Sequence, residues 1–102
     1  MMKKINEISE EIGELESVES IYLFGSRVNS PEKSQSDIDL CIVIEDSSDE
    51  DSIYEKIVDL IQQEKTLIHP IIYKRTEFNN KIKINTYKES IIKKGKLTYK
   101  KK

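Results

Sequence analysis

The chain has 102 residues, of which 36% are hydrophobic and 35% are charged, and its formal net charge is −2. This length allows one domain, residues 1–102, with a hydrophobic core of modest size. Apolar runs at 21–24, 38–44, 57–61 and 67–73 exclude a disordered chain, because such a chain lacks enough apolar surface to bury.

The first half of the chain predicts a helix, a strand, a loop and a second strand. Residues 3–16 carry apolar side chains at spacings of three or four, which predicts a helix with one apolar face. Residues 19–24 (ESIYLF) are rich in strand formers, and residues 25–36 combine Gly, Asn, Pro and Ser, as loops do. Residues 37–44 (DIDLCIVI) alternate Ile and Leu with other residues and are apolar on both faces in their second half. This pattern predicts a strand inside a sheet.

The second half predicts a helix, a strand and another helix. Asp51 or Ser52 is expected to cap a helix that runs to about Glu64. Residues 66–73 predict a third strand, in which Pro70 indicates a sheet edge or a bulge. A last helix is expected from Thr76 to about residue 92. The expected fold class is therefore α+β, a small mixed β-sheet with helices packed on one face.

The charge is unevenly distributed along the chain. Residues 1–73 hold 6 basic and 17 acidic residues, whereas residues 74–102 hold 11 basic and 2 acidic residues. The basic end is either a partner surface or a solvated and partly frayed tail from about residue 93, and residues 97–99 allow a short strand. Its few aromatic residues match no base-stacking module, so nucleic-acid binding is not expected.

The single cysteine, Cys41, excludes a disulfide within the chain and is expected to be a small core residue. No apolar segment approaches the roughly 18 residues of a membrane span. The N-terminal residues also lack the apolar core of a signal peptide. We expect a cytoplasmic protein that does not enter a membrane.

Two features near residues 25–39 (GSRVNSPEKSQSDID) point to a nucleotide site. Asp37 and Asp39 are two positions apart, so in a strand their carboxylates lie on one side, where they repel each other unless a cation separates them. Mg²⁺ is held by such carboxylates together with substrate phosphates. Gly25 and Ser26 follow the previous strand, where a glycine lets the backbone approach a phosphate. Together they predict a site for a nucleoside triphosphate with Mg²⁺.

The stretch IYLFGSRVNSPEKSQSDIDLCIVI resembles the signature of the minimal nucleotidyltransferases, a group within the DNA polymerase β-like superfamily that includes small antitoxins. Its Gly-Ser pair, ten intervening residues and Asp-x-Asp match that signature without a gap. The resemblance implies the nucleotidyltransferase fold and transfer of a nucleotide, most simply AMP from ATP, to a hydroxyl. It assigns Gly25, Ser26, Arg27 and Ser36 to nucleotide binding, and Asp37 and Asp39 to catalysis and Mg²⁺ binding.

The resemblance also implies a partner, because small members pair with HEPN-domain ribonucleases and some silence the toxin by adding AMP to a tyrosine. The chain has no separate substrate-binding domain, so a partner or a second copy in a homo-oligomer must hold the acceptor. Two departures bear on activity: Val28-Asn29-Ser30 stands where many members have Ala-Arg-Gly, and the third strand lacks the family's third carboxylate. His69 or a neighbour occupies that place, where an imidazole either binds a metal, accepts a proton or is structural. The alternative to an enzyme is therefore a degenerate transferase that neutralises its partner by binding alone.

Overall fold

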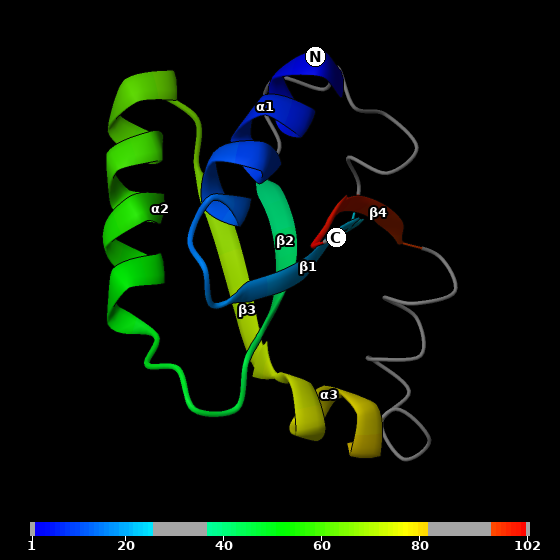
Figure 1. The fold of residues 1–102 in the computed structure, drawn as a ribbon. Helices are drawn as coiled ribbons and strands as arrows, with labels where there is room; N and C mark the ends of the chain where they lie inside the picture. Colours follow the sequence, from blue (N-terminus) through cyan, green and yellow to red (C-terminus); the bar gives the residue numbers. More distant parts are fainter. Residues whose placement is uncertain (1, 26–36, 82–94, 102) are drawn as a thin grey trace.

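The computed structural model describes residues 2–25, 37–81 and 95–101, which form three helices and four strands (Figure 1). In chain order these are α1 (Met2–Gly13), β1 (Val18–Phe24), β2 (Ile38–Ile44), α2 (Asp51–Glu64), β3 (Ile68–Lys74), α3 (Arg75–Lys81) and β4 (Lys96–Lys100). The α+β class is confirmed, and each expected helix and strand is present in the described ranges. The expected continuation of the last helix to about residue 92 lies outside the described residues.

The four strands form one mixed sheet in the order β3-β2-β1-β4. The pairs β1–β2 and β1–β4 are antiparallel, whereas β2–β3 is parallel. Since β2 lies between β1 and β3, its prediction as an inner strand is confirmed. Pro70 lies in β3, which is an edge strand of the sheet. An edge strand tolerates proline, because the backbone N–H that proline lacks is not needed there to pair with a further strand.

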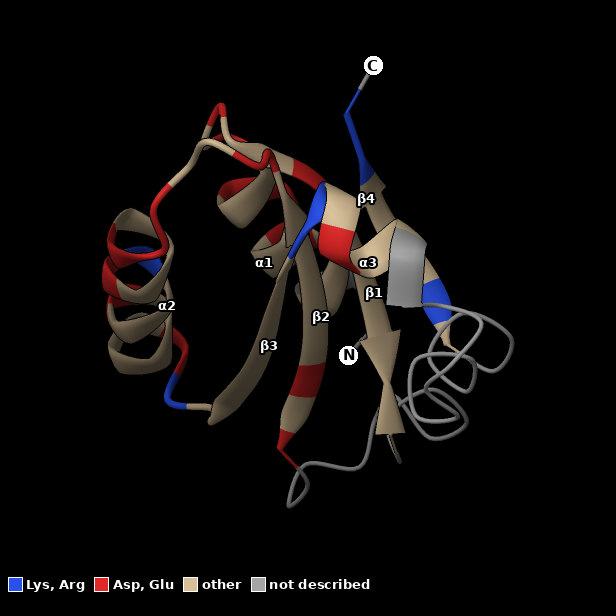
Figure 2. Ribbon diagram, turned by 90° about the horizontal axis from the view of Figure 1, so that it is seen from below, with Lys and Arg blue, Asp and Glu red and all other residues tan. Residues whose placement is uncertain are grey.

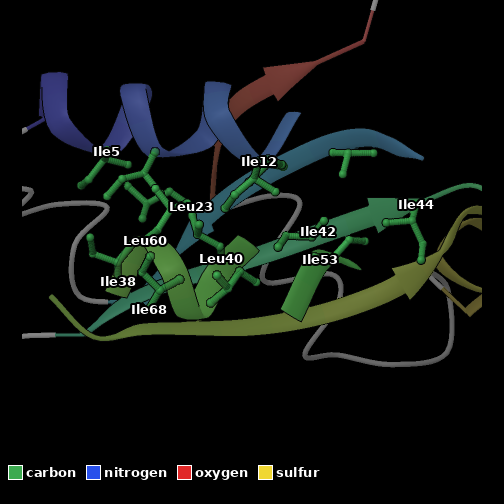
Figure 3. Close-up of a cluster of buried hydrophobic side chains, with 14 residues drawn as sticks. Ile5, Ile12, Leu23, Ile38, Leu40, Ile42, Ile44, Ile53, Leu60 and Ile68 are labelled. Carbon is green, nitrogen blue, oxygen red and sulfur yellow. The ribbon is translucent and has the colours of Figure 1, made fainter. Parts of the chain in front are cut away.

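The main core lies between the sheet and the helices α1 and α2 (Figure 3). Every second residue of β2 enters this core, which is the alternation that its sequence predicts. The buried members are Ile5, Ile8, Ile12, Val18, Ile21, Leu23, Ile38, Leu40, Ile42, Ile44, Ile53, Ile57, Leu60 and Ile68. Burial of each such side chain contributes about 1.5–3 kcal/mol, so this row of contacts determines which face of β2 points inward.

The opposite face of the sheet carries a smaller apolar cluster that includes α3. Phe78 is buried there with Cys41 and Val43 of β2, and its ring lies 5.8 Å from that of Tyr22 and 5.9 Å from that of Tyr73. The one-sided arrangement of helices therefore holds for α1 and α2, while α3 covers part of the other face. Cys41 is fully buried, as expected for a core residue.

The short strand expected at residues 97–99 is present as the edge strand β4, and this segment is tied to α1. The hydroxyl of buried Ser9 donates to Thr98 Oγ1 at 2.8 Å, and Thr98 Oγ1 donates to the Ile21 carbonyl at 3.2 Å. Gly13 lies against the ring of Tyr99, where a Cβ on residue 13 would overlap the ring atoms. These contacts tie the strand to α1 and β1 through buried Ser9 and the half-buried side chains of Thr98 and Tyr99.

Part of the charge asymmetry is compensated within the fold. Arg75 lies 3.0 Å from the carboxylate of Glu19, and Lys101 lies 3.5 Å from that of Glu45. The Lys101 ammonium also donates to the Glu16 carbonyl at 2.8 Å. Such exposed pairs contribute little stability each, but they place basic residues of the C-terminal third against acidic residues from the first half.

The helix caps differ from those that the sequence suggests. The N-cap residue of α2 is Glu50, which makes no side-chain capping bond, so the assignment of the cap to Asp51 or Ser52 is wrong. Instead the Asp49 carboxylate accepts the Asp51 N–H at 2.8 Å. Within the described ranges, the protein has no helix of the length and apolar character that a membrane span requires.

Candidate nucleotide and metal site

The candidate site lies at one end of the sheet, where β1 ends and where β2 and β3 begin. Asp39 of β2 is the register partner of Phe24, the last residue of β1, and of His69 in β3. Figure 2 shows acidic segments at this end of β2, beside the end of β1. The Ile row of β2 faces the core, so Asp39 lies on the other face with Cys41 and Val43.

Gly25 holds a backbone conformation and a position that require glycine. Its φ is +79°, in the left-handed region that other residues rarely adopt. A Cβ on residue 25 would overlap Oδ2 of Asp39 and would lie 3.2 Å from Asp39 Cγ. The backbone at Gly25 therefore closely approaches the Asp39 carboxylate.

The second oxygen of Asp39 faces β3. Its Oδ1 lies 3.5 Å from His69 Nδ1, and the Asp39 side chain is 24% exposed while that of His69 is 72% exposed. One carboxylate thus lies between the backbone of Gly25 and an exposed imidazole. It is shielded by the protein but remains open to a ligand from solvent.

Partial burial raises the pKa of the Asp39 carboxyl above its usual value, and the negative charge of Asp37 raises it further. The nearby His69 acts in the opposite direction through its charge and its hydrogen-bonding nitrogen. The fold therefore disfavours the negative charge on Asp39 on balance, which is the situation that a bound cation relieves.

Asp37 is exposed and immediately precedes β2. Together with Asp39, which lies against the backbone of Gly25, it offers hard oxygen donors at the open end of the sheet. This donor set fits Mg²⁺, which keeps several waters and takes further oxygens from a substrate. Within residues 2–25, 37–81 and 95–101, no three His, Cys, Asp or Glu side chains form a metal-binding group. A nucleotide and waters would thus have to complete the coordination.

Three of the predicted site residues, Ser26, Arg27 and Ser36, lie outside the described residues. Of the other three, Gly25 and Asp39 are in direct contact, and Asp37 is close enough to influence Asp39 electrostatically. The sequence identifies His69 only as a residue of the third strand, whereas the structure places it beside Asp39 in the candidate site. The parallel register between β2 and β3 brings it there, and register is not visible in the sequence.

Comparison with known proteins gives the family. A model of the nucleotidyltransferase domain matches residues 5–98. The curated proteins contain no match to the chain.

Three solved structures have a similar fold. A mutant of the toxin-antitoxin MntA-HpeT is 16% identical with a TM-score of 0.60, over 100% of this chain and 75% of that one. A putative nucleotidyltransferase from Sulfolobus solfataricus is 22% identical with a TM-score of 0.56, over 99% and 81%. A toxin-antitoxin with AMP-PNP is 19% identical with a TM-score of 0.58, over 98% and 73%. With the family model matching almost the whole length, the chain belongs to the nucleotidyltransferase domain family.

Proposed function

We propose that the protein is the antitoxin of a toxin–antitoxin pair and transfers AMP from ATP, with Mg²⁺, to a hydroxyl of a HEPN-type toxin. Family membership supports nucleotidyl transfer, and two of the similar structures are of toxin-antitoxins, one of them with AMP-PNP. The observation that supports the proposal is the contact between Gly25 and Asp39, the residues to which we assign phosphate binding and metal binding.

In this proposal each site residue has one task. The backbone at Gly25 and Ser26 binds the triphosphate, and Arg27 and Ser36 contribute further nucleotide contacts. Asp37 and Asp39 hold the metal. A bound divalent ion would neutralise the phosphates and stabilise charge on the attacking and leaving oxygens. The protein acts mainly by positioning, because phosphoryl and nucleotidyl transfers require little other covalent chemistry from the enzyme.

The proposed reaction is balanced without another reactant. The acceptor hydroxyl oxygen forms a bond to the α-phosphorus of ATP, while the bond from that phosphorus to the oxygen bridging to the β-phosphorus breaks. Pyrophosphate leaves with the electron pair, and the hydroxyl proton passes to solvent or to a nearby base. The product is AMP joined to the partner through a phosphodiester bond.

The test is incubation of the protein with α-³²P-labelled ATP, Mg²⁺ and a candidate HEPN ribonuclease. We expect covalent label on the ribonuclease, and we expect the double variant Asp37→Asn/Asp39→Asn to abolish it. Lys74→Gln, at the far end of β3 from His69, is the matched control and should label normally. An unlabelled ribonuclease in the presence of wild-type protein would contradict the enzymatic proposal.

One observation favours a second candidate, a degenerate transferase that inhibits its partner by binding alone. The residue of β3 that pairs with Asp39 is His69, and β3 carries no carboxylate. If the wild-type protein suppresses the ribonuclease without labelling it, and Asp37→Asn/Asp39→Asn suppresses it equally, this candidate is correct. Under either candidate we propose a single domain over residues 1–102 that acts in the cytoplasm, where a ribonuclease meets its RNA.

A further inference from the structure

The parallel pairing of β2 with β3 puts a nitrogen donor beside the proposed metal ligand. Asp39 and His69 are direct register partners, and Asp39 Oδ1 and His69 Nδ1 are 3.5 Å apart. Both belong to strands anchored by the main core through their neighbours Ile38, Leu40 and Ile68. The pair is therefore held in place by the sheet.

The separation of the two atoms suits a shared ion. Two donors each about 2.1 Å from one divalent ion lie roughly 3.0–3.4 Å apart, depending on the coordination angle. The His69 side chain is 72% exposed, so a small rotation of its ring closes the difference from 3.5 Å without displacing packed atoms. The carboxylate needs no movement, and its other oxygen remains against Gly25.

We propose that His69 is a nitrogen ligand of the metal in this protein, so that the site prefers transition-metal ions over Mg²⁺. This rests on the proposed function, which assigns Asp37 and Asp39 to the metal. Mg²⁺ favours oxygen ligands, whereas an imidazole raises affinity for first-row transition ions in the order Mn²⁺, Co²⁺, Ni²⁺. An imidazole beside the Asp39 carboxylate, in a third strand without a carboxylate, thus changes the choice of ion.

The sequence makes this proposal unusually simple to test, because His69 is the only histidine in the chain. Tag-free protein would be titrated with Mn²⁺ alone, without nucleotide, and bound ion would be measured from the loss of the free-ion EPR signal. Pulsed EPR would then detect a nitrogen bonded to Mn²⁺. We expect a histidine nitrogen signal in wild type, its loss in His69→Gln, and an affinity at least about tenfold lower in that variant.

Two further variants complete the test. His69→Asp should retain the ion without the nitrogen signal and should reverse the preference, so that Mg²⁺ competes with Mn²⁺ better than in wild type. Lys74→Gln should behave as wild type does. Mn²⁺ bound without a nitrogen signal, equal affinity in His69→Gln, or no binding of Mn²⁺ by wild type would each overturn the proposal.

The outcome is separable from that of the proposed function. Labelling of the toxin with Mg²⁺ while the nitrogen signal is absent would reject the role of His69 and leave AMP transfer standing. A nitrogen signal in a protein that labels no partner would support the metal site and reject the transfer. The two measurements use different readouts, so one cannot fail merely because the other does.

Discussion

Replacing Gly25 with alanine tests the contact on which the candidate site depends. The structure predicts two separate free-energy costs of this substitution. A φ of +79° costs an alanine about 1–2 kcal/mol. The new Cβ also overlaps Oδ2 of Asp39, which adds about 1 kcal/mol for an overpacked contact. We expect Gly25→Ala to lower the free energy of unfolding by about 2–3 kcal/mol.

A double-mutant cycle separates the two penalties. Asp39→Ala removes Oδ2 and Cγ but keeps the Cβ, which lies 3.5 Å from the position of a Cβ on residue 25, an ordinary contact distance. In that background Gly25→Ala should cost only the backbone penalty of about 1–2 kcal/mol. The coupling energy between the two positions should therefore be about 1 kcal/mol, within the range usual for residues in contact.

The assay is urea denaturation of the four proteins without metal, followed by fluorescence of tyrosine or by circular dichroism. Equal costs of Gly25→Ala in both backgrounds would show that the carboxylate does not lie against residue 25, and the geometry assigned to the site would be wrong. A small cost in both would refute the left-handed backbone as well. Metal is left out because bound ion would add stability through Asp39 and confuse the cycle.

Three further predictions concern other contacts. Thr76 N–H donates to Asp46 at 2.9 Å and its hydroxyl also donates there, which lowers the pKa of Asp46. The stability that this carboxylate contributes is present above pH of about 4 and is lost as the pH falls through its lowered pKa. Asp46→Asn should therefore be less stable than wild type at pH 7. The difference between their urea midpoints should shrink at pH 3. Gly13→Ala should destabilise by about 1–3 kcal/mol through overlap with Tyr99, and adding Tyr99→Leu should recover part of that loss in the same urea assay. Asp39→Asn should leave the metal-free urea midpoint unchanged or higher, because burial disfavours the charge that it removes; a lower midpoint would contradict this.

The regular elements could be predicted because their patterns are local. The spacing of Ile5, Ile8 and Ile12 specifies α1, and the alternation of Ile38 with Leu40 specifies β2 and its buried face. The covering of the other face by α3 could not be predicted, because it depends on how Phe78 fits between rings from distant strands. The cap of α2 could not be predicted from the sequence either. Several acidic and hydroxyl side chains follow one another there, and only the backbone conformation determines which of them accepts a hydrogen bond from the helix N-terminus.

The candidate site likewise has residues that the sequence predicts and a neighbour that it does not predict. Gly25, Asp37 and Asp39 could be proposed from spacing alone, because residue type and separation reflect their chemistry. The nearness of His69 to Asp39 could not, because it results from pairing between strands 30 positions apart in the sequence. Because β2 pairs with β3, the second neighbour of the Asp39 carboxylate is a residue of β3 and not a residue of a helix.

The packing of the core against one face of β2 determines which residues lie in the candidate site on the other face. A slip of one residue in the pairing of β2 would turn Asp39 into the core and bring Leu40 to the surface, so the buried row prevents it. The same register brings Gly25 to one side of Asp39 and His69 to the other. Because the His69 side chain is exposed and does not belong to the core clusters, exchange at position 69 would alter the proposed ligand set of the metal while the strands stay in place. With these proposed roles, the identity of the ion can change through one side chain, independently of the turn that we propose binds the phosphates.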